Sequence, residues 1–292
     1  MCTDQATLYK SPMRQVNRYK YQMICQFQNY HHQHQSKAIQ SNSSLIPTQI
    51  PATFKMTPAR KALIAITSAK ATLNKETTGL FITEALHPYN VLVAAGFEVD
   101  LASETGTYTA DWLSQTPDFL NGEDLIIWND VNSDFRKKLD NMPKAADLDA
   151  SQYGVFYASA GHAALIDYPT ATSLQKVAEQ VWASGGVVAS VCHGPAIFAN
   201  ILDRETGKPV IQGRRLTGFT TEAENTMGII GDLKSWNVEL CEELAARLGA
   251  KYERSVGIWD DFHVVDGRLV TGQNPASATS TAKAAVEVFE KL

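Results

Sequence analysis

From about residue 60 to the C-terminus, short apolar runs typical of buried strands alternate with longer patterns typical of helices. The strand-like runs are rich in β-branched and small residues, and turn residues bound them. They are ALIAIT (62–67), EVDLAS (98–103), YGVFYASA (153–160) and GVVASV (186–191). Near-continuous apolar strands are typical of a parallel sheet that is covered on both faces.

The helix-like patterns lie between and after these runs. They cover residues 81–96, 170–186, 237–249 and 277–292. In the second of them, apolar residues recur at three- and four-residue spacing, and Gly185 is the expected C-cap. The alternation predicts a single α/β domain, a three-layer sandwich around a mostly parallel sheet, with residues 104–150 as a small acidic insertion.

The first 55 residues differ in composition from the rest of the chain. They are rich in Gln, Ser and Asn, and they hold six basic residues against one acid, Asp4. Such a segment is expected to be disordered or to be a targeting extension. A catalytic domain is therefore predicted over residues 56–292, and Met56 is an alternative start of the protein.

Charge and cysteine usage limit the classes of partner and compartment. The formal net charge of −5 argues against nucleic acid as the main partner, and no apolar run reaches membrane-spanning length. The four cysteines show neither a CxxC pair nor metal-ligand spacing, which favours a reducing compartment. We expect a cytoplasmic or nuclear protein, or a mitochondrial one if residues 1–55 are a transit peptide.

The stretch SVCHGPA places a cysteine where the last strand-like run ends. Cys192 follows GVVASV and precedes GPAIFANIL, in which a helix is expected. A nucleophile on such a sharp turn needs small residues two positions away on either side, and Ser190 and Gly194 satisfy this. The N-terminus of the following helix is expected to lower the pKa of the thiol from about 8.5. Cys241, by contrast, has the helical spacing of a core residue.

Several motifs resemble the ThiJ/PfpI superfamily, which has the class I glutamine-amidotransferase-like fold. The motifs are ASVCHGPA, YASAGHAAL, TGLFITEALHPYNVL, FEVDLASETG and DGRLVTGQNPASA. Within the superfamily they most resemble the fungal heat-shock-inducible branch, which acts as a glutathione-independent glyoxalase III and as a chaperone. The resemblance runs from about Lys61 to the C-terminus.

The resemblance assigns roles to five positions. It implies that Cys192 is the nucleophile, that His193 is the catalytic histidine, and that Glu84 is the acid beside the cysteine. Glu224 would be the third member of the triad, although physical reasoning alone does not separate it from Glu222. The backbone N–H groups of Gly161 and His193 would form an oxyanion site. His162, His87 and the loop residues Trp259, Asp260 and Asp261 are interpreted as structural or as lining the pocket.

The resemblance implies an enzyme that converts methylglyoxal to lactate without a metal or an organic cofactor. The Cys192 thiolate would form a hemithioacetal, and either Glu84 or His193 would move the proton. The expected partners are small dicarbonyl aldehydes such as methylglyoxal and glyoxal, unfolded client proteins and a second copy of the chain in a homodimer. A protein deglycase activity would need the same site.

Two alternative functions belong to other classes of protein. The chain could be a holdase chaperone in which enzyme activity is secondary, or a cysteine peptidase or amidase. An aldehyde-consumption assay with a cysteine mutant distinguishes the glyoxalase from a chaperone. A panel of peptide substrates distinguishes it from a peptidase or amidase.

Overall fold

The computed structural model describes residues 58–292, which form one compact unit. Its centre is a six-stranded sheet in the order β4-β1-β5-β6-β10-β9. The strands are β1 (Lys61–Ile66), β4 (Glu98–Ser103), β5 (Val155–Ala158), β6 (Val187–Val191), β9 (His263–Asp266) and β10 (Leu269–Gly272). All neighbouring pairs are parallel except β10 and β9, which form an antiparallel hairpin at one edge.

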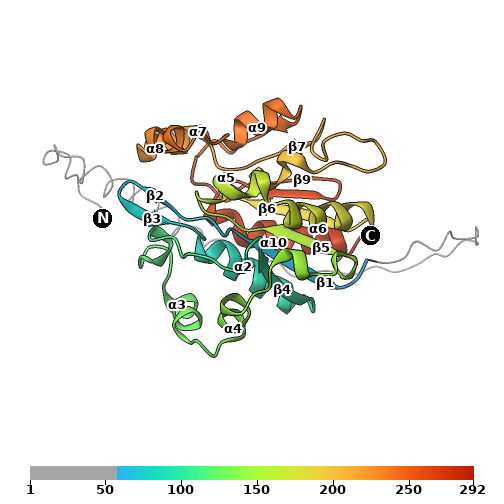
Figure 1. Cartoon of the computed structure of the whole chain (residues 1–292), viewed down its shortest axis with the longest axis horizontal. Coiled ribbons are helices and arrows are strands. Elements are labelled where there is room, and N and C mark those ends of the chain that lie inside the picture. Colours follow the sequence, from blue (N-terminus) through green and yellow to red (C-terminus); the bar gives the residue numbers. More distant parts are fainter. Residues whose placement is uncertain (1–57) are drawn as a thin grey trace, which may run out of the picture. The chain divides into compact units, whose positions relative to one another are not determined.

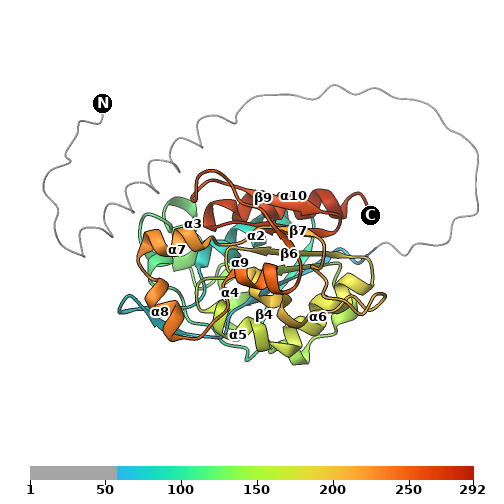
Figure 2. The same ribbon diagram turned by 90° about the horizontal axis from the view of Figure 1, so that it is seen from above.

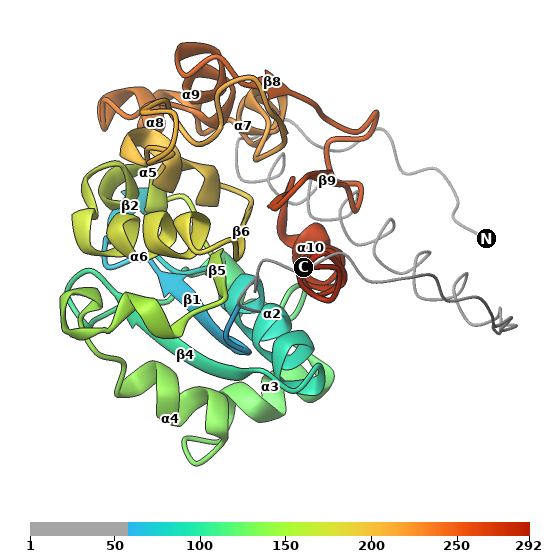
Figure 3. The same ribbon diagram turned by 90° about the vertical axis from the view of Figure 1, so that its right-hand side faces the viewer.

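Helices cover both faces of the sheet, so the predicted three-layer α/β fold is confirmed. On one face α2 (Ile82–Ala94) packs against β1 and β4, and α10 (Ala278–Phe289) packs against β6, β10 and α2 (Figure 1). On the other face α6 (Thr172–Ala183) packs against β5 and β6 (Figure 3). All five residues of β6 are buried, as expected for a strand in the middle of the sheet.

The predicted insertion supplies two short helices beside the edge strand β4. These are α3 (Gly122–Asn129) and α4 (Asp134–Asp140) (Figure 1). Helix α4 contacts β4, and its side chains Phe135 and Leu139 are buried. None of the residues of α3 is buried. The insertion also contains 3-10 turns at Leu113–Gln115, Ala145–Asp147 and Ala150–Gln152.

Smaller elements complete the part of the chain that the structure describes. Two helices differ in length from the prediction. α9 spans Cys241–Arg247 rather than 237–249, and α10 starts after a 3-10 turn at Pro275–Ser277. The others are β2 (Ala71–Leu73), β3 (Glu76–Thr78), α5 (Ala164–Asp167), η4 (Tyr168–Thr170), η5 (Gly194–Asn200), β7 (Arg215–Leu216), α7 (Thr221–Met227), α8 (Ile230–Ser235) and β8 (Lys251–Tyr252). Figure 2 shows α7, α8 and α9 from above.

No helix of residues 58–292 is both long enough and apolar enough to cross a membrane. The predicted division of the chain near residue 55 stays a prediction, since the extension lies outside the described residues.

Candidate active site

Cys192 occupies the sharp turn that the sequence predicts. It follows β6 directly, and its φ of 59° lies in the left-handed region that side chains other than glycine seldom adopt. A Cβ atom on Gly194 would lie 2.5 Å from the carbonyl oxygen of Ala158 and 3.1 Å from the Cβ of Ser190. Only glycine fits at position 194, and a larger residue at 190 would crowd it further, as the turn requires.

The segment after Cys192 departs from the prediction in one respect. Residues Gly194–Asn200 form the 3-10 helix η5 rather than an α-helix. Pro195 stands at the start of η5, where its missing N–H costs nothing. The shorter hydrogen-bonded turns of a 3-10 helix align fewer peptide dipoles towards the thiol than the expected α-helix would.

The thiol, an imidazole and a carboxylate form a chain of contacts at the carboxyl end of β6. Cys192 Sγ lies 3.2 Å from His193 Nδ1, and His193 Nε2 lies 2.8 Å from Glu224 Oε1. An ionised carboxylate only accepts hydrogen bonds, so we assign the imidazole proton to Nε2. Nδ1 then presents its lone pair to the thiol. Sulfur, base and acid therefore have the connectivity of a catalytic triad.

Glu224 comes from the first turn of α7, whose N-cap Thr220 accepts a hydrogen bond from Ala223 N. The carboxylate is buried, which favours the neutral acid, but His162 and His193 outweigh burial and lower the pKa of Glu224 to about 2. Glu222, two residues earlier, instead forms an ion pair at the surface with Arg254. The structure thus separates the two acids that the sequence alone left equivalent.

Glu84, in the first turn of α2, is fully buried beside Cys192. Neither carboxylate oxygen makes a hydrogen bond of normal geometry within residues 58–292, although the Cys192 thiol and the Ala160 backbone are near enough to act on its charge. Burial raises the pKa of Glu84 well above its usual value, since an ion there lacks water.

The prediction of a lowered thiol pKa is wrong. Burial and the neighbouring Glu84 carboxyl raise the pKa of the Cys192 thiol above its usual value. Two negative charges side by side in a dry site repel each other, so the pair resists loss of its last proton. Thiolate can form at Cys192 only when Glu84 holds that proton or when another base accepts it.

The two predicted oxyanion donors follow neighbouring strands, β5 and β6. Within the described chain, neither the N–H of Gly161 nor that of His193 donates a backbone hydrogen bond. Gly161 has a φ of 148°, and a Cβ atom there would lie 2.1 Å from the carbonyl oxygen of Gly79. Both N–H groups are free to bind a developing oxyanion.

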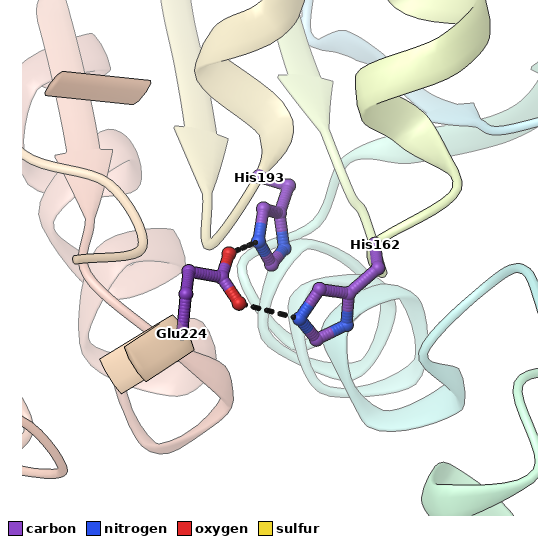
Figure 4. Close-up of side chains that lie close together, drawn as sticks. All are labelled: His162, His193 and Glu224. Atoms are coloured by element: carbon purple, nitrogen blue, oxygen red, sulfur yellow. Dashed lines mark hydrogen bonds and ion pairs between the residues drawn. The ribbon is translucent and has the colours of Figure 1, made fainter. Parts of the chain in front are cut away.

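His162 belongs to this site, whereas its position after a turn glycine predicts a structural role. It is 8% exposed, and its Nε2 lies 3.1 Å from the second oxygen of Glu224, so one carboxylate bridges two imidazoles (Figure 4). The ring of Phe219 packs against both imidazoles, with centroids 4.6 Å from His193 and 5.5 Å from His162. One sequence signal could have found His162. It comes just after the carboxyl end of a predicted strand, and ligand sites of α/β sheets gather beyond these ends.

The remaining residues lie around the site or away from it. Trp259 is buried, with its ring 6.0 Å from that of Phe219, so it belongs to the apolar surroundings of the site. Asp260 accepts a hydrogen bond from Gly257 N, and Asp261 accepts one from Ser280. His87 pairs with Asp124, 2.7 Å away.

Cys241 is buried at the start of α9, as predicted for a core residue. Its Sγ lies 3.6 Å from the Cys192 carbonyl oxygen, so it packs against the turn that carries the nucleophile.

The ligand atoms of His162, His193 and Glu224 lie within 4.8 Å of one another, a set that could hold a metal ion. Two histidines and a carboxylate are a donor set that zinc accepts. In the structure these atoms are hydrogen-bonded to one another. The prediction of a metal-free site stays a prediction.

The fold and this geometry define an α/β protein with a cysteine–histidine–glutamate triad at the carboxyl edge of a parallel sheet. The chain belongs to the DJ-1/PfpI family, whose model matches residues 77–288.

Two curated relatives match the chain over nearly their whole length. Glyoxalase 3 of Candida albicans is 48% identical over 232 residues, which cover 79% of this chain and 98% of that protein. A glutathione-independent glyoxalase of Saccharomyces cerevisiae is 46% identical, with coverage of 79% and 98%. The crystal structure of glyoxalase III from Candida albicans matches with a TM-score of 0.78 and 48% identity, over 80% of this chain and 98% of that one.

Proposed function

We propose that this protein is a glutathione-independent glyoxalase, a glyoxalase III of the D-lactate dehydratase type, which converts methylglyoxal and water to lactate. The observation that carries the proposal is the Cys192–His193–Glu224 chain of contacts, with Sγ 3.2 Å from a neutral imidazole nitrogen. The relatives named glyoxalase, matched over 98% of their length, support the same activity.

The first step is addition of the thiol to the aldehyde carbon of the substrate. As the S–C bond forms, the proton of Cys192 passes to Nδ1 of His193. Burial and the neighbouring His162 lower the pKa of His193 to about 4, so at neutral pH this nitrogen is a vacant acceptor. The aldehyde oxygen then receives the proton, and the product is a hemithioacetal. The N–H groups of Gly161 and His193 stabilise the oxyanion while it forms.

The second step moves a hydrogen from the former aldehyde carbon to the neighbouring ketone carbon through an enediol. Glu84 suits this step because its carboxyl is next to Sγ, makes no hydrogen bond of normal geometry and has a raised pKa. A carboxylate whose pKa is raised is a stronger base than a free one, so it takes a proton from carbon more readily. Glu84 takes the proton from the first carbon and returns it to the second, while the hydroxyl proton of the first carbon passes to the oxygen of the second. The hemithioacetal thereby becomes a lactoyl thioester.

Water then hydrolyses the thioester, which releases lactate and restores the thiol. The cysteine of the protein supplies the sulfur that glutathione would otherwise provide. No oxidant is needed, because one carbon is oxidised as its neighbour is reduced.

Turnover of methylglyoxal by the purified protein without glutathione tests the proposal. The expected result is lactate in a one-to-one ratio to the methylglyoxal consumed, and no lactate with Cys192→Ala. Turnover that depends on added glutathione, or that persists in Cys192→Ala, contradicts it.

A holdase function is a second candidate, favoured by exposed apolar side chains on and after α3. Ile126 is 70% exposed and Val131 is 61% exposed. Suppression of the aggregation of a heat-denatured client by the Cys192→Ala protein, lost in Ile126→Glu, would support it. We also propose a domain boundary near residue 55, a homodimer and a cytoplasmic location.

A further inference from the structure

His162, His193 and Glu224 bring three metal-ligating side chains to one place, and the triad uses only two of them. His193 Nε2 lies 2.8 Å from Glu224 Oε1, and His162 Nε2 lies 3.1 Å from Glu224 Oε2. Both imidazole rings therefore turn a nitrogen towards the same carboxylate (Figure 4). One ligand atom from each of the three residues lies within 4.8 Å of the others. His162 has no role of its own in the proposed reaction.

The spacing of these atoms is close to the spacing of ligand atoms around a zinc ion. Zinc binds imidazole nitrogen and carboxylate oxygen at about 2.0–2.2 Å with tetrahedral angles, so two of its ligand atoms lie about 3.4 Å apart. The two nitrogen–oxygen distances of the cluster fall short of that value by only about 0.3 and 0.6 Å. A rotation of the carboxylate group and small movements of the rings supply this adjustment. Three protein ligands leave the fourth position of the ion to water.

The surroundings of the cluster favour zinc over magnesium or calcium. None of the three side chains is more than 10% exposed, and the ring of Phe219 packs against both imidazoles. Two nitrogen ligands with one carboxylate suit zinc, whereas magnesium and calcium prefer oxygen ligands. His162 is the most exposed member of the cluster, so an ion enters from its side.

We propose that His162, His193 and Glu224 bind one zinc ion, and that zinc bound there reversibly inhibits the reaction of Cys192. A neutral imidazole holds one proton, so a His193 ring with zinc on Nε2 carries that proton on Nδ1. Nδ1 lies 3.2 Å from Cys192 Sγ, and it then donates to the sulfur instead of accepting the thiol proton. The base of the first step is lost while the ion stays bound. The inhibition rests on the proposed function, but the binding of zinc does not.

Competition with a chromogenic chelator measures the affinity of the full-length chain for zinc. His31→Ala, His32→Ala and His34→Ala are present throughout, because these histidines of the N-terminal sequence also offer metal ligands. We expect His162→Gln to lower the affinity by more than about a hundredfold, since loss of a residue that only supports a ligand already costs about 10- to 100-fold. Equal affinity with and without His162→Gln overturns the proposal.

Two control variants separate this site from other ligands of the chain. His87 also faces a carboxylate, with Nε2 2.7 Å from Asp124 Oδ2, but no third metal-ligating group joins this pair in the described chain. His87→Gln should therefore leave the affinity for zinc unchanged. Cys192→Ser removes the thiol but keeps an acceptor for the Nδ1 proton, and it should change the affinity by less than about tenfold. Loss of binding in either control overturns the proposal, because the ion then has other ligands.

Turnover of methylglyoxal without glutathione measures the inhibition. Saturating zinc should lower turnover by about a hundredfold or more, because the reaction loses its general base. EDTA should restore the rate, and the same concentration of magnesium should have no effect. Full turnover with zinc bound overturns the inhibition. If the metal-free protein does not consume methylglyoxal, the proposed function fails, and the affinity measurements still decide whether the zinc site exists.

Zinc-loaded crystals of the unmutated protein cover the case in which His162→Gln does not fold. Anomalous scattering at the zinc absorption edge locates the ion directly. The expected peak lies between the two imidazoles and the Glu224 carboxylate. A peak only at other residues, or no peak at all, overturns the proposal.

Discussion

Cys192 Sγ and His193 Nδ1 lie 3.2 Å apart although the two residues are adjacent in the chain. Successive side chains of a strand point to opposite faces, so neighbours do not normally meet. The contact exists because the strand ends at Val191 and Cys192 takes a φ of 59°. One unusual backbone conformation therefore aligns the nucleophile with its base. The same relationship makes several properties of the protein predictable.

Cys192→Ala should abolish turnover of methylglyoxal, because loss of a nucleophile costs several orders of magnitude in rate. Cys241→Ala is the control, because the Cys241 thiol is buried and packs against the Cys192 carbonyl oxygen. We expect it to retain turnover and to lose on the order of 1 kcal/mol of the free energy of unfolding through a small cavity. Steady-state kinetics and urea unfolding measure the two effects. Equal losses of activity would show that the roles of the cysteines are misassigned.

Glu84→Gln should lower kcat by roughly a hundredfold or more, because an amide cannot carry the proton between the two carbons. The same change should stabilise the fold. The raised pKa of Glu84 means that the native state holds a proton that the unfolded state releases above its usual value of 4.5. That difference costs stability increasingly as the pH rises from 4.5 towards the folded pKa. The gain in the free energy of unfolding should therefore be larger at neutral pH than below pH 4.5, and a uniform gain would contradict this cause.

Glu224→Gln and Glu222→Gln form a pair on one helix. The first removes the carboxylate that binds His193, and turnover should fall by roughly two to four orders of magnitude. The second removes an exposed ion pair with Arg254, and both turnover and stability should change little, by less than about 1 kcal/mol. Steady-state kinetics of the two variants show which of the two glutamates is the acid of the triad.

The low pKa of Glu224 has a separate consequence for acid stability. Its folded pKa is about 2, below the usual 4.5, so the ionised group contributes stability that is complete above pH 4.5. That contribution is lost as the pH falls towards 2. Glu224→Gln should therefore show a weaker loss of stability between pH 4.5 and 2 than the unmutated protein. An identical acid denaturation profile would contradict the lowered pKa of Glu224 and its pairing with His162 and His193.

Gly161→Ala should destabilise the protein by at least about 2 kcal/mol and reduce turnover. The new Cβ atom would lie 2.1 Å from the Gly79 carbonyl oxygen, which must move and take the oxyanion donor with it. Gly207 also has a positive φ, 67°, but nothing lies within 4 Å of its missing Cβ. Gly207→Ala should cost only about 1 kcal/mol and leave turnover unchanged. Thermal unfolding and kinetics of both variants test this contrast.

Deletion of residues 1–55 should leave the melting temperature and turnover unchanged, because the compact unit and the matched family segment both begin after residue 55. Circular dichroism and the lactate assay measure the outcome. A truncated protein that unfolds at a lower temperature would show that the extension packs against the domain. Import of a reporter fused to residues 1–55 into mitochondria would change the predicted compartment.

The central strands could be predicted from sequence because burial on both faces makes their side chains apolar throughout. The edge hairpin of β9 and β10 is not among the elements that the sequence predicts. β9 has one buried residue and so lacks an apolar run, and β10, although buried, has only four residues. The Asp266–Gly267 turn of this hairpin did carry a readable hairpin signal. The length of the last helices was less predictable, because ends of helices depend on local caps and packing.

The site could be predicted only in part. The turn at Cys192 follows from its small neighbours, which are local in sequence. The role of His162 depends on β5 being the neighbour of β6, and the choice between Glu222 and Glu224 depends on which side of α7 faces the sheet. The direction of the thiol pKa depends on Glu84, 108 positions away in the sequence. These three features depend on contacts between residues that are distant in the sequence, so only the tertiary structure shows them.

The two ends of the triad are supported by parts of very different size. Cys192 and His193 extend from a central strand, whereas Glu224 sits on α7, a helix of seven residues. A helix that short does not persist without its packing, so it belongs to a segment that can open without unfolding of the whole sheet. Warming should detach the acid from the imidazole while the sheet is intact. Catalysis should then cease below the melting temperature, and amide hydrogens of α7 should exchange with solvent before those of β6.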